Sequence, residues 1–199
     1  MENINENKAS QMGDNLSKNK PISGTQKSDF DETRILISQL TRLFEEELKD
    51  IHWAEEALVK AMPKLIKNAR TPDLRDAISN HLTETENQVR RIEQVFEILG
   101  KNVSSKKCEA MEGLIKEADE IMRTCDEGIM RDEGIIAAAQ KVEHYEISTY
   151  GTLHQIAETL GLVKAVKLIQ STLDEEKAAD RKLTEIAIRI ANKQNIHAN

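Results

Sequence analysis

Aromatic residues are scarce in this chain of 199 residues, where Phe, Trp and Tyr together make up only 3% of the sequence. Proline and glycine are also few, with three and eight residues. Ala, Leu, Ile, Glu and Lys dominate instead, and most of these have a high helix propensity. We therefore predict an all-helical bundle, and the length suits a single domain with a substantial core.

Cysteine and long apolar runs are lacking too. The two cysteines, Cys108 and Cys125, lie in no CxxC pattern and provide no disulfide framework. No run of about 18 apolar residues could span a bilayer, and residues 1–30 lack the apolar core of a signal peptide. These absences predict a soluble protein of the reducing cytoplasm.

An excess of basic charge is also missing, since the net charge is −7 at pH 7. Nucleic acids and anionic membranes are bound by basic surfaces, so neither is an expected partner. Small, neutral or cationic partners are expected, and metal ions are among them. The sequence contains no Gly-rich phosphate loop, Ser nucleophile motif or dinucleotide fingerprint.

The hydrophobic pattern divides the chain into three parts. Residues 1–32 are rich in Asn, Lys and Ser without apolar periodicity, which predicts a disordered tail. Residues 33–192 carry apolar side chains at helical spacing and form the predicted bundle, while residues 193–199 are expected to fray. We expect four long helices, with a shorter crossover helix over residues 106–125 between the second and the third.

The last long helix has an apolar stripe that two acids interrupt. In alternating steps of three and four residues, the stripe consists of Val166, Ile169, Leu173, Glu176, Asp180, Leu183, Ala187 and Ile190. If this stripe faces a core, Glu176 and Asp180 face it as well. Buried carboxylates are costly unless they are paired or bind a metal.

The other three long helices also carry acids on their apolar faces, namely Glu55, Glu84, Glu143 and Glu146. Thr71-Pro72 and Gly161 indicate the turns of two antiparallel hairpins. Glu55 and Glu84 lie about 15 residues from the first turn, and Glu146 and Glu176 lie equally far from the second, a depth of roughly 20 Å. Both pairs are therefore expected at one level of the bundle.

Six carboxylates at a common depth predict a metal site formed by Glu55, Glu84, Glu143, Glu146, Glu176 and Asp180. Such a buried cluster would repel itself unless several groups were protonated, whereas divalent cations neutralise it. Oxygen-rich ligation suits iron or manganese, and bridging carboxylates can hold two ions. A partly hydrated acidic core without metal is the alternative.

This pattern resembles the four-helix di-metal carboxylate proteins of the ferritin-like superfamily, and Glu143-x-x-Glu146 resembles the third helix of rubrerythrins. More closely, the chain resembles the YciF/YciE-type bacterial stress proteins, a ferritin-like family. The match covers nearly everything after residue 33. It is carried by the segments LKDIHWAEEAL, HLTETENQVRRIEQVFE, KKCEAMEGLIKEADE, AAAQKVEHYEISTYGTL and LDEEKAADRKLTEIA. The resemblance implies an antiparallel four-helix bundle with a crossover helix, and a homodimer.

The chain departs from the superfamily pattern, which has a His three residues after a Glu on two helices. Asn87 and Ala179 stand at these positions. Gln88 and Asp180, one residue further on, are candidate substitutes, and His81 is a candidate ligand or hydrogen-bond partner of one. Tyr150 is either a packed core residue or a hydrogen-bond donor or redox relay beside the site.

The resemblance implies a di-metal stress protein that acts on dioxygen or hydrogen peroxide at a carboxylate-bridged centre. Iron is the expected metal and manganese the alternative. A second hypothesis is a non-catalytic stress protein that binds a protein partner, with the metal structural or absent. The sequence leaves enzymatic activity open between these two hypotheses.

Overall fold

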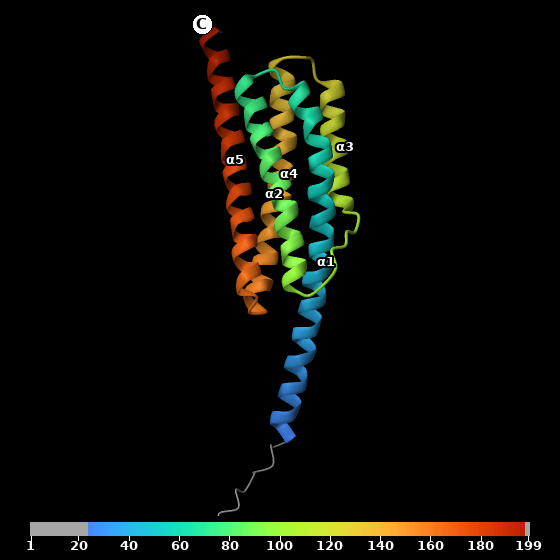
Figure 1. Cartoon of the computed structure of the whole chain (residues 1–199). Helices are drawn as coiled ribbons and strands as arrows, with labels where there is room; N and C mark the ends of the chain where they lie inside the picture. Colours follow the sequence, from blue (N-terminus) through green and yellow to red (C-terminus); the bar gives the residue numbers. More distant parts are fainter. Residues whose placement is uncertain (1–23, 198–199) are drawn as a thin grey trace, which may run out of the picture. The chain divides into compact units, whose positions relative to one another are not determined.

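A computed structural model describes the backbone of residues 24–197 and the side chains of residues 31–193. It contains five helices in the order α1 (Gly24–Asn68), α2 (Pro72–Ile98), α3 (Glu109–Thr124), α4 (Ile129–Thr159) and α5 (Val163–His197) (Figure 1). No strand occurs between residues 24 and 197. The predicted all-α fold is confirmed.

Both ends of the helical region extend beyond the sequence-based boundaries. α1 begins at Gly24 and not near residue 33, and α5 continues to His197. The chain divides into two units after Leu36, and the side chains of residues 31–36 in the first unit are exposed. Exposed side chains such as those of residues 31–36 need no apolar periodicity, so the sequence pattern did not show this part of the helix. Most of the predicted tail, residues 1–23, lies outside the described residues.

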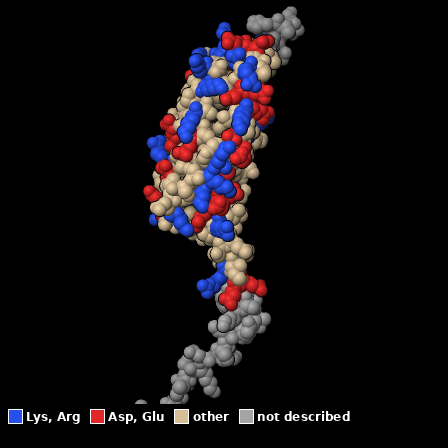
Figure 2. Space-filling model, turned by 90° about the vertical axis from the view of Figure 1, so that its right-hand side faces the viewer, with Lys and Arg blue, Asp and Glu red and all other residues tan. Residues whose placement is uncertain are grey.

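In the second unit, α1 and α2 form one antiparallel hairpin and α4 and α5 form another (Figure 1). α4 packs against α5 and α3, and α2 packs against α5. α3 leads the chain back along the bundle, so that α2 and α4 begin at the same end (Figure 1). This is the predicted crossover. Figure 2 shows Lys and Arg side chains interspersed with Asp and Glu on one face of the molecule.

The turns of the two hairpins follow their local sequence. Thr71 has extended backbone angles and precedes Pro72, the first residue of α2. Proline suits this position because its missing N–H would have no helical partner. Gly161 separates α4 from α5 with a φ of 69°, a left-handed conformation that favours glycine.

As an acid near the start of the third long helix, Asp132 could serve as its N-terminal cap, but the structure places it differently. α4 begins at Ile129, so Asp132 lies within its first turn, where it is fully buried. Its carboxylate accepts hydrogen bonds from the backbone N–H groups of Arg70 (2.7 Å) and Thr71 (2.8 Å), and from the Thr71 hydroxyl. Asp132 therefore joins the start of α4 to the turn before α2.

The core consists of two apolar clusters. The first includes Phe44, Leu48, Ile51, Ile92, Phe96, Leu153 and Ile169. The second, nearer the α1–α2 turn, includes Met62, Leu74, Ile78, Ile135, Leu183, Ile186 and Ile190. On α2 and α5, buried polar residues lie between the two clusters in the sequence, namely His81, Thr85, Gln88 and Glu176. On α1 and α4, the buried Glu55, Glu143 and Glu146 lie between residues of the first cluster. These seven residues form a polar layer across the bundle.

Candidate metal centre

The polar layer receives side chains from four helices. α1 contributes Glu55, α2 contributes His81, α4 contributes Glu143 and Glu146, and α5 contributes Glu176. A spacing of three residues places Glu143 and Glu146 on the same face of α4. None of these five residues has more than 7% of its surface exposed. The helices thus bring four acids into the interior with one histidine.

His81, Glu143, Glu146 and Glu176 form a compact group, which we call the ligand cluster. Each offers one ligand atom, and these atoms all lie within 4.8 Å of one another. His81 Nε2 is 3.2 Å from Glu143 Oε1 and 3.6 Å from Glu176 Oε2. Three carboxylates and an imidazole at such separations can converge on one cation.

Glu55 lies in the same layer and is held by Tyr150. The Tyr150 hydroxyl donates a hydrogen bond to Glu55 Oε1, and both side chains are buried. Burial raises the pKa of Glu55 to about 7, although the bond from Tyr150 and the charge of His81 act in the opposite direction. A pKa near neutral means that the protonated and the ionised form of Glu55 are both populated around pH 7.

Charge in the ligand cluster is destabilised by burial. Burial raises the pKa of Glu146 well above its usual range, and the neighbouring carboxylates of Glu176 and Glu55 raise it further. Burial likewise raises the pKa of Glu176, although the charge of His81 opposes this. Burial lowers the pKa of His81, but the carboxylates of Glu143, Glu84 and Glu176 outweigh it and hold that pKa well above normal.

Several carboxylate oxygens in this layer have no hydrogen-bond partner. They are the Oε2 atoms of Glu55, Glu143, Glu146 and Glu176, all buried. A buried oxygen without a partner costs free energy, and a cation at the ligand cluster would satisfy those of Glu143, Glu146 and Glu176. The residues present therefore fit a divalent metal ion by both donor type and position.

A series of hydrogen bonds from α2 holds the Glu176 carboxylate in position. Gln88 Nε2 donates to Glu176 Oε1 and to Glu175 Oε2, the latter at 3.1 Å. Arg91 in turn pairs with Glu175, with 2.6 Å between Nη2 and Oε1. Gln88 is therefore a positioning residue for Glu176 in this structure, and the Arg91–Glu175 pair supports it.

Glu84 and Asp180 lie at the edge of the layer, outside the ligand cluster. The Glu84 side chain is 45% exposed, and its Oε2 lies 3.3 Å from His81 Nδ1. Asp180 is 23% exposed and contacts His144 Nε2 at 3.3 Å and Gln140 Nε2 at 3.1 Å. The structure thus brings together His81 and three of the six predicted carboxylates, with Glu55 beside them.

The sequence patterns missed Thr85 and the Arg91–Glu175 pair. Thr85 is fully buried on the inner face of α2, where its hydroxyl donates to the His81 carbonyl oxygen at 2.9 Å. It follows His81 by four residues, so helical spacing places it on the same face. Glu175 adjoins Glu176, and Arg91 follows Gln88 by three residues. These spacings are the features of the sequence from which the three residues could have been predicted.

Comparisons with known proteins place this chain in a family. Residues 39–195 match the model of a domain of unknown function, DUF892. Protein YciF of Escherichia coli (strain K12) is 48% identical over 148 residues, which cover 74% of this chain and 89% of YciF. No helix within the described part of the chain is long and apolar enough to cross a membrane.

Solved structures agree with this relationship. The crystal structure of the E. coli stress protein YciF matches with a TM-score of 0.75 and 46% identity, covering 77% of this chain and 98% of that one. YcfI of Rhodopseudomonas palustris, for which a structural role has been suggested, matches with a TM-score of 0.70 and 44% identity, covering 73% and 92%. The predicted resemblance is confirmed, and the chain belongs to the DUF892 family as a relative of the stress protein YciF.

Proposed function

We propose that this protein is a metal-dependent oxidoreductase of stress defence, which holds two iron or manganese ions and acts on dioxygen or hydrogen peroxide. The observation that carries the proposal is the set of buried, unpartnered carboxylate oxygens around His81. Four carboxylates balance the charge of two divalent cations when His81 is neutral, which is its metal-binding form. The similarity to a stress protein supports the physiological setting.

The residues of the chain have separate roles in this proposal. Glu143, Glu146 and Glu176 supply oxygen ligands and His81 supplies a nitrogen ligand, while Glu55 completes the set from α1. Tyr150 orients Glu55 and Gln88 orients Glu176 through their hydrogen bonds. The bound metals would supply the electrons that reduce the oxidant. Because His81 also contacts the half-exposed Glu84, a proton released from His81 has an acceptor on the way to solvent.

The first test is elemental analysis of the protein purified without chelator, with an optical spectrum recorded before and after addition of hydrogen peroxide. We expect about two iron or manganese ions per chain and a spectrum that responds to peroxide. The Glu146→Gln variant should lose at least tenfold in metal affinity, because it removes one charged ligand of similar size. Unchanged metal content in that variant would contradict the assignment.

A matched control is Glu158→Gln, which changes the same residue type on the same helix. The Glu158 side chain is half-exposed at the C-terminal end of α4, and among the described residues its carboxylate pairs with His154, at 3.8 Å. Its replacement should leave both metal content and the peroxide response unchanged. An equal loss in both variants would indicate a general effect of charge and not a ligand at the cluster.

The second candidate is a non-catalytic stress protein with a structural metal or none. The structural role suggested for YcfI favours it. The negative charge of the carboxylates is also partly balanced without a metal, because His81 contacts Glu143, Glu84 and Glu176. Metal that stays bound but does not respond to peroxide would support this candidate, as would the absence of redox metal after anaerobic reconstitution with ferrous iron.

A further inference from the structure

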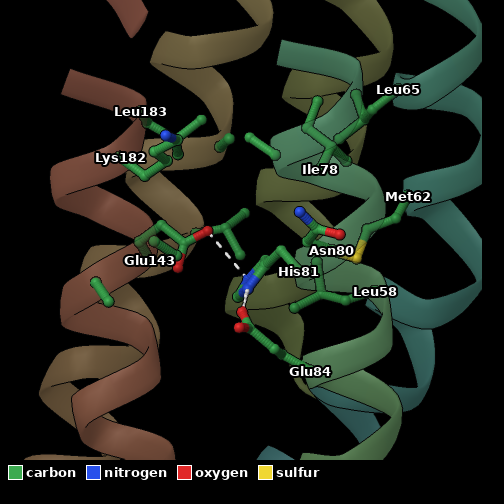
Figure 3. Close-up of a pocket in the computed structure, with 15 residues that line it drawn as sticks. Leu58, Met62, Leu65, Ile78, Asn80, His81, Glu84, Glu143, Lys182 and Leu183 are labelled. Atoms are coloured by element: carbon green, nitrogen blue, oxygen red, sulfur yellow. Dashed lines mark hydrogen bonds and ion pairs between the residues drawn. The ribbon is translucent and has the colours of Figure 1, made fainter. Parts of the chain in front are cut away.

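A cavity of about 320 Å³ lies beside the ligand cluster, among α1, α2, α4 and α5 (Figure 3). Its wall is mostly apolar and includes Leu58, Met62, Leu65, Ile78, Val142 and Leu183. Small side chains line the places where α2, α4 and α5 face it, namely Ala77, Ala139, Ala178 and Ala179. Larger residues at these positions would fill the space.

The cavity connects the ligand cluster to solvent. His81 and Glu143 belong both to the cluster and to the cavity wall. Asn80 on α2 and Ala178 and Lys182 on α5 also line the cavity, and all three are exposed. The mouth therefore opens between α2 and α5, while the inner end reaches two of the proposed ligands.

The size of the cavity indicates the size of its occupant. One water molecule takes up about 30 Å³ in the liquid, and dioxygen and hydrogen peroxide are of similar size. The cavity is about ten times larger and falls within the lower range of pockets that bind organic molecules. An oxidant alone would need only a narrow passage, so the space suits an additional, larger molecule.

The lining indicates the chemistry of that molecule. The apolar wall favours a hydrocarbon chain, because burying such a chain releases apolar surface from water. At the mouth, Lys182 supplies a positive charge that pairs with no carboxylate among the described residues. Glu84 also lines the cavity but is engaged by His81. An anionic group is therefore favoured at Lys182 and disfavoured at the inner, acidic end.

We propose that this cavity binds an organic molecule with an apolar chain and a carboxylate end, of about the size of a medium-chain fatty acid. The chain lies along the apolar wall toward His81 and Glu143, and the carboxylate pairs with Lys182. This names a substrate class for the metal centre and to that extent rests on the proposed function. Binding itself requires only the cavity and Lys182.

The test is a calorimetric titration of the metal-free full-length chain with decanoate. Decanol serves as the uncharged control ligand. Both should bind at one saturable site. Lys182→Met should weaken decanoate binding about tenfold, since a charge-assisted contact is lost, and should leave decanol binding unchanged. Absence of decanoate binding to the unaltered chain would overturn the proposal, and an unchanged decanoate affinity in the variant would overturn the role of Lys182.

A second pair of variants tests the location. Ala179→Phe should fill the cavity and weaken both ligands at least tenfold, whereas Ala137→Phe on the exposed face of α4, outside the cavity lining, should weaken neither. Equal binding by Ala179→Phe and the unaltered chain would place the ligand elsewhere and overturn the proposal. The metal content of the purified protein is measured in parallel. If the protein holds no metal but binds decanoate, the result contradicts the proposed metal centre and leaves the proposed cavity ligand standing.

Discussion

Tyr150 contacts both the apolar core and the proposed metal centre. Its ring belongs to the first apolar cluster, while its hydroxyl donates to Glu55. Burial raises the pKa of Tyr150 well above its usual value, and the neighbouring Glu55 carboxylate raises it further, so the hydroxyl keeps its proton and remains a donor. The sequence offered a core residue and a hydrogen-bond donor as alternatives, and the structure shows both roles together.

Tyr150→Phe is expected to weaken metal binding about tenfold, because the bond that orients Glu55 is lost. The metal-free protein should also lose about 1–3 kcal/mol in free energy of unfolding, since a second Glu55 oxygen becomes unpartnered. Metal titration and urea unfolding measure the two effects.

The matched control is Tyr145→Phe. The Tyr145 hydroxyl donates to Asp50 at 2.8 Å and contacts Cys108, away from the ligand cluster. Its removal should therefore leave metal affinity unchanged. If both variants bind metal as the unaltered protein does, Tyr150 does not position a ligand.

At the scale of helices, equal distance from the turn correctly predicts that the two acids of the second hairpin meet, but it predicts the acids of the first hairpin only in part. Glu146 and Glu176 are level with each other and meet in the ligand cluster. In the first hairpin, the inner face of α2 passes through His81, Thr85 and Gln88, so that Glu84 lies at the edge. Depth depends on the rise per residue, but burial depends on rotation about the helix axis, which neighbouring helices set.

Asp132 is expected to hold the two hairpins together at one end of the bundle. In Asp132→Ala, the backbone N–H groups of Arg70 and Thr71 lose their acceptor, and both bonds are charge-assisted. We expect the free energy of unfolding to fall by about 2–4 kcal/mol, measured by urea unfolding. Asp132→Asn should recover part of this loss because its amide oxygen still accepts. A change below about 0.5 kcal/mol in Asp132→Ala would show that the contact is not structural.

At the scale of the whole molecule, the buried acids make the stability of the metal-free protein depend on pH. The folded-state pKa of Glu55 is raised to about 7, and those of Glu146 and Glu176 are also raised. The folded protein therefore binds more protons than the unfolded chain between pH 5 and the raised pKa values, and protonation stabilises it. The raised pKa of His81 acts in the same direction.

We expect the free energy of unfolding of the metal-free protein to fall as the pH rises from about 5 to 8, by at most about 1.4 kcal/mol per pH unit for each group that titrates. Bound metal should reverse this trend, because ligands must lose their protons to bind. Urea unfolding at several pH values, with and without metal, measures both. A pH-independent stability of the metal-free protein would contradict the protonated state inferred for the cluster.

The homodimer expected from the resemblance stays a prediction, and so do the dioxygen or peroxide substrate and the number of metal ions. The fold was predicted closely, because helix propensity, apolar spacing and the two turns are all local properties. The helix before residue 33 was missed because its described side chains are exposed and leave no periodic pattern.

The sequence by itself determined an all-α bundle, its two hairpins and crossover, and the depth at which acids interrupt the apolar stripes. Only the tertiary structure decided which acids enter the interior. Glu143, Glu146 and Glu176 converge on His81, while Glu84 and Asp180 remain at the edge. The cavity beside them was likewise invisible in the sequence. The physical reason is that helical spacing fixes which residues share a face, but the rotation of each helix and the space left between helices result from packing against all the others.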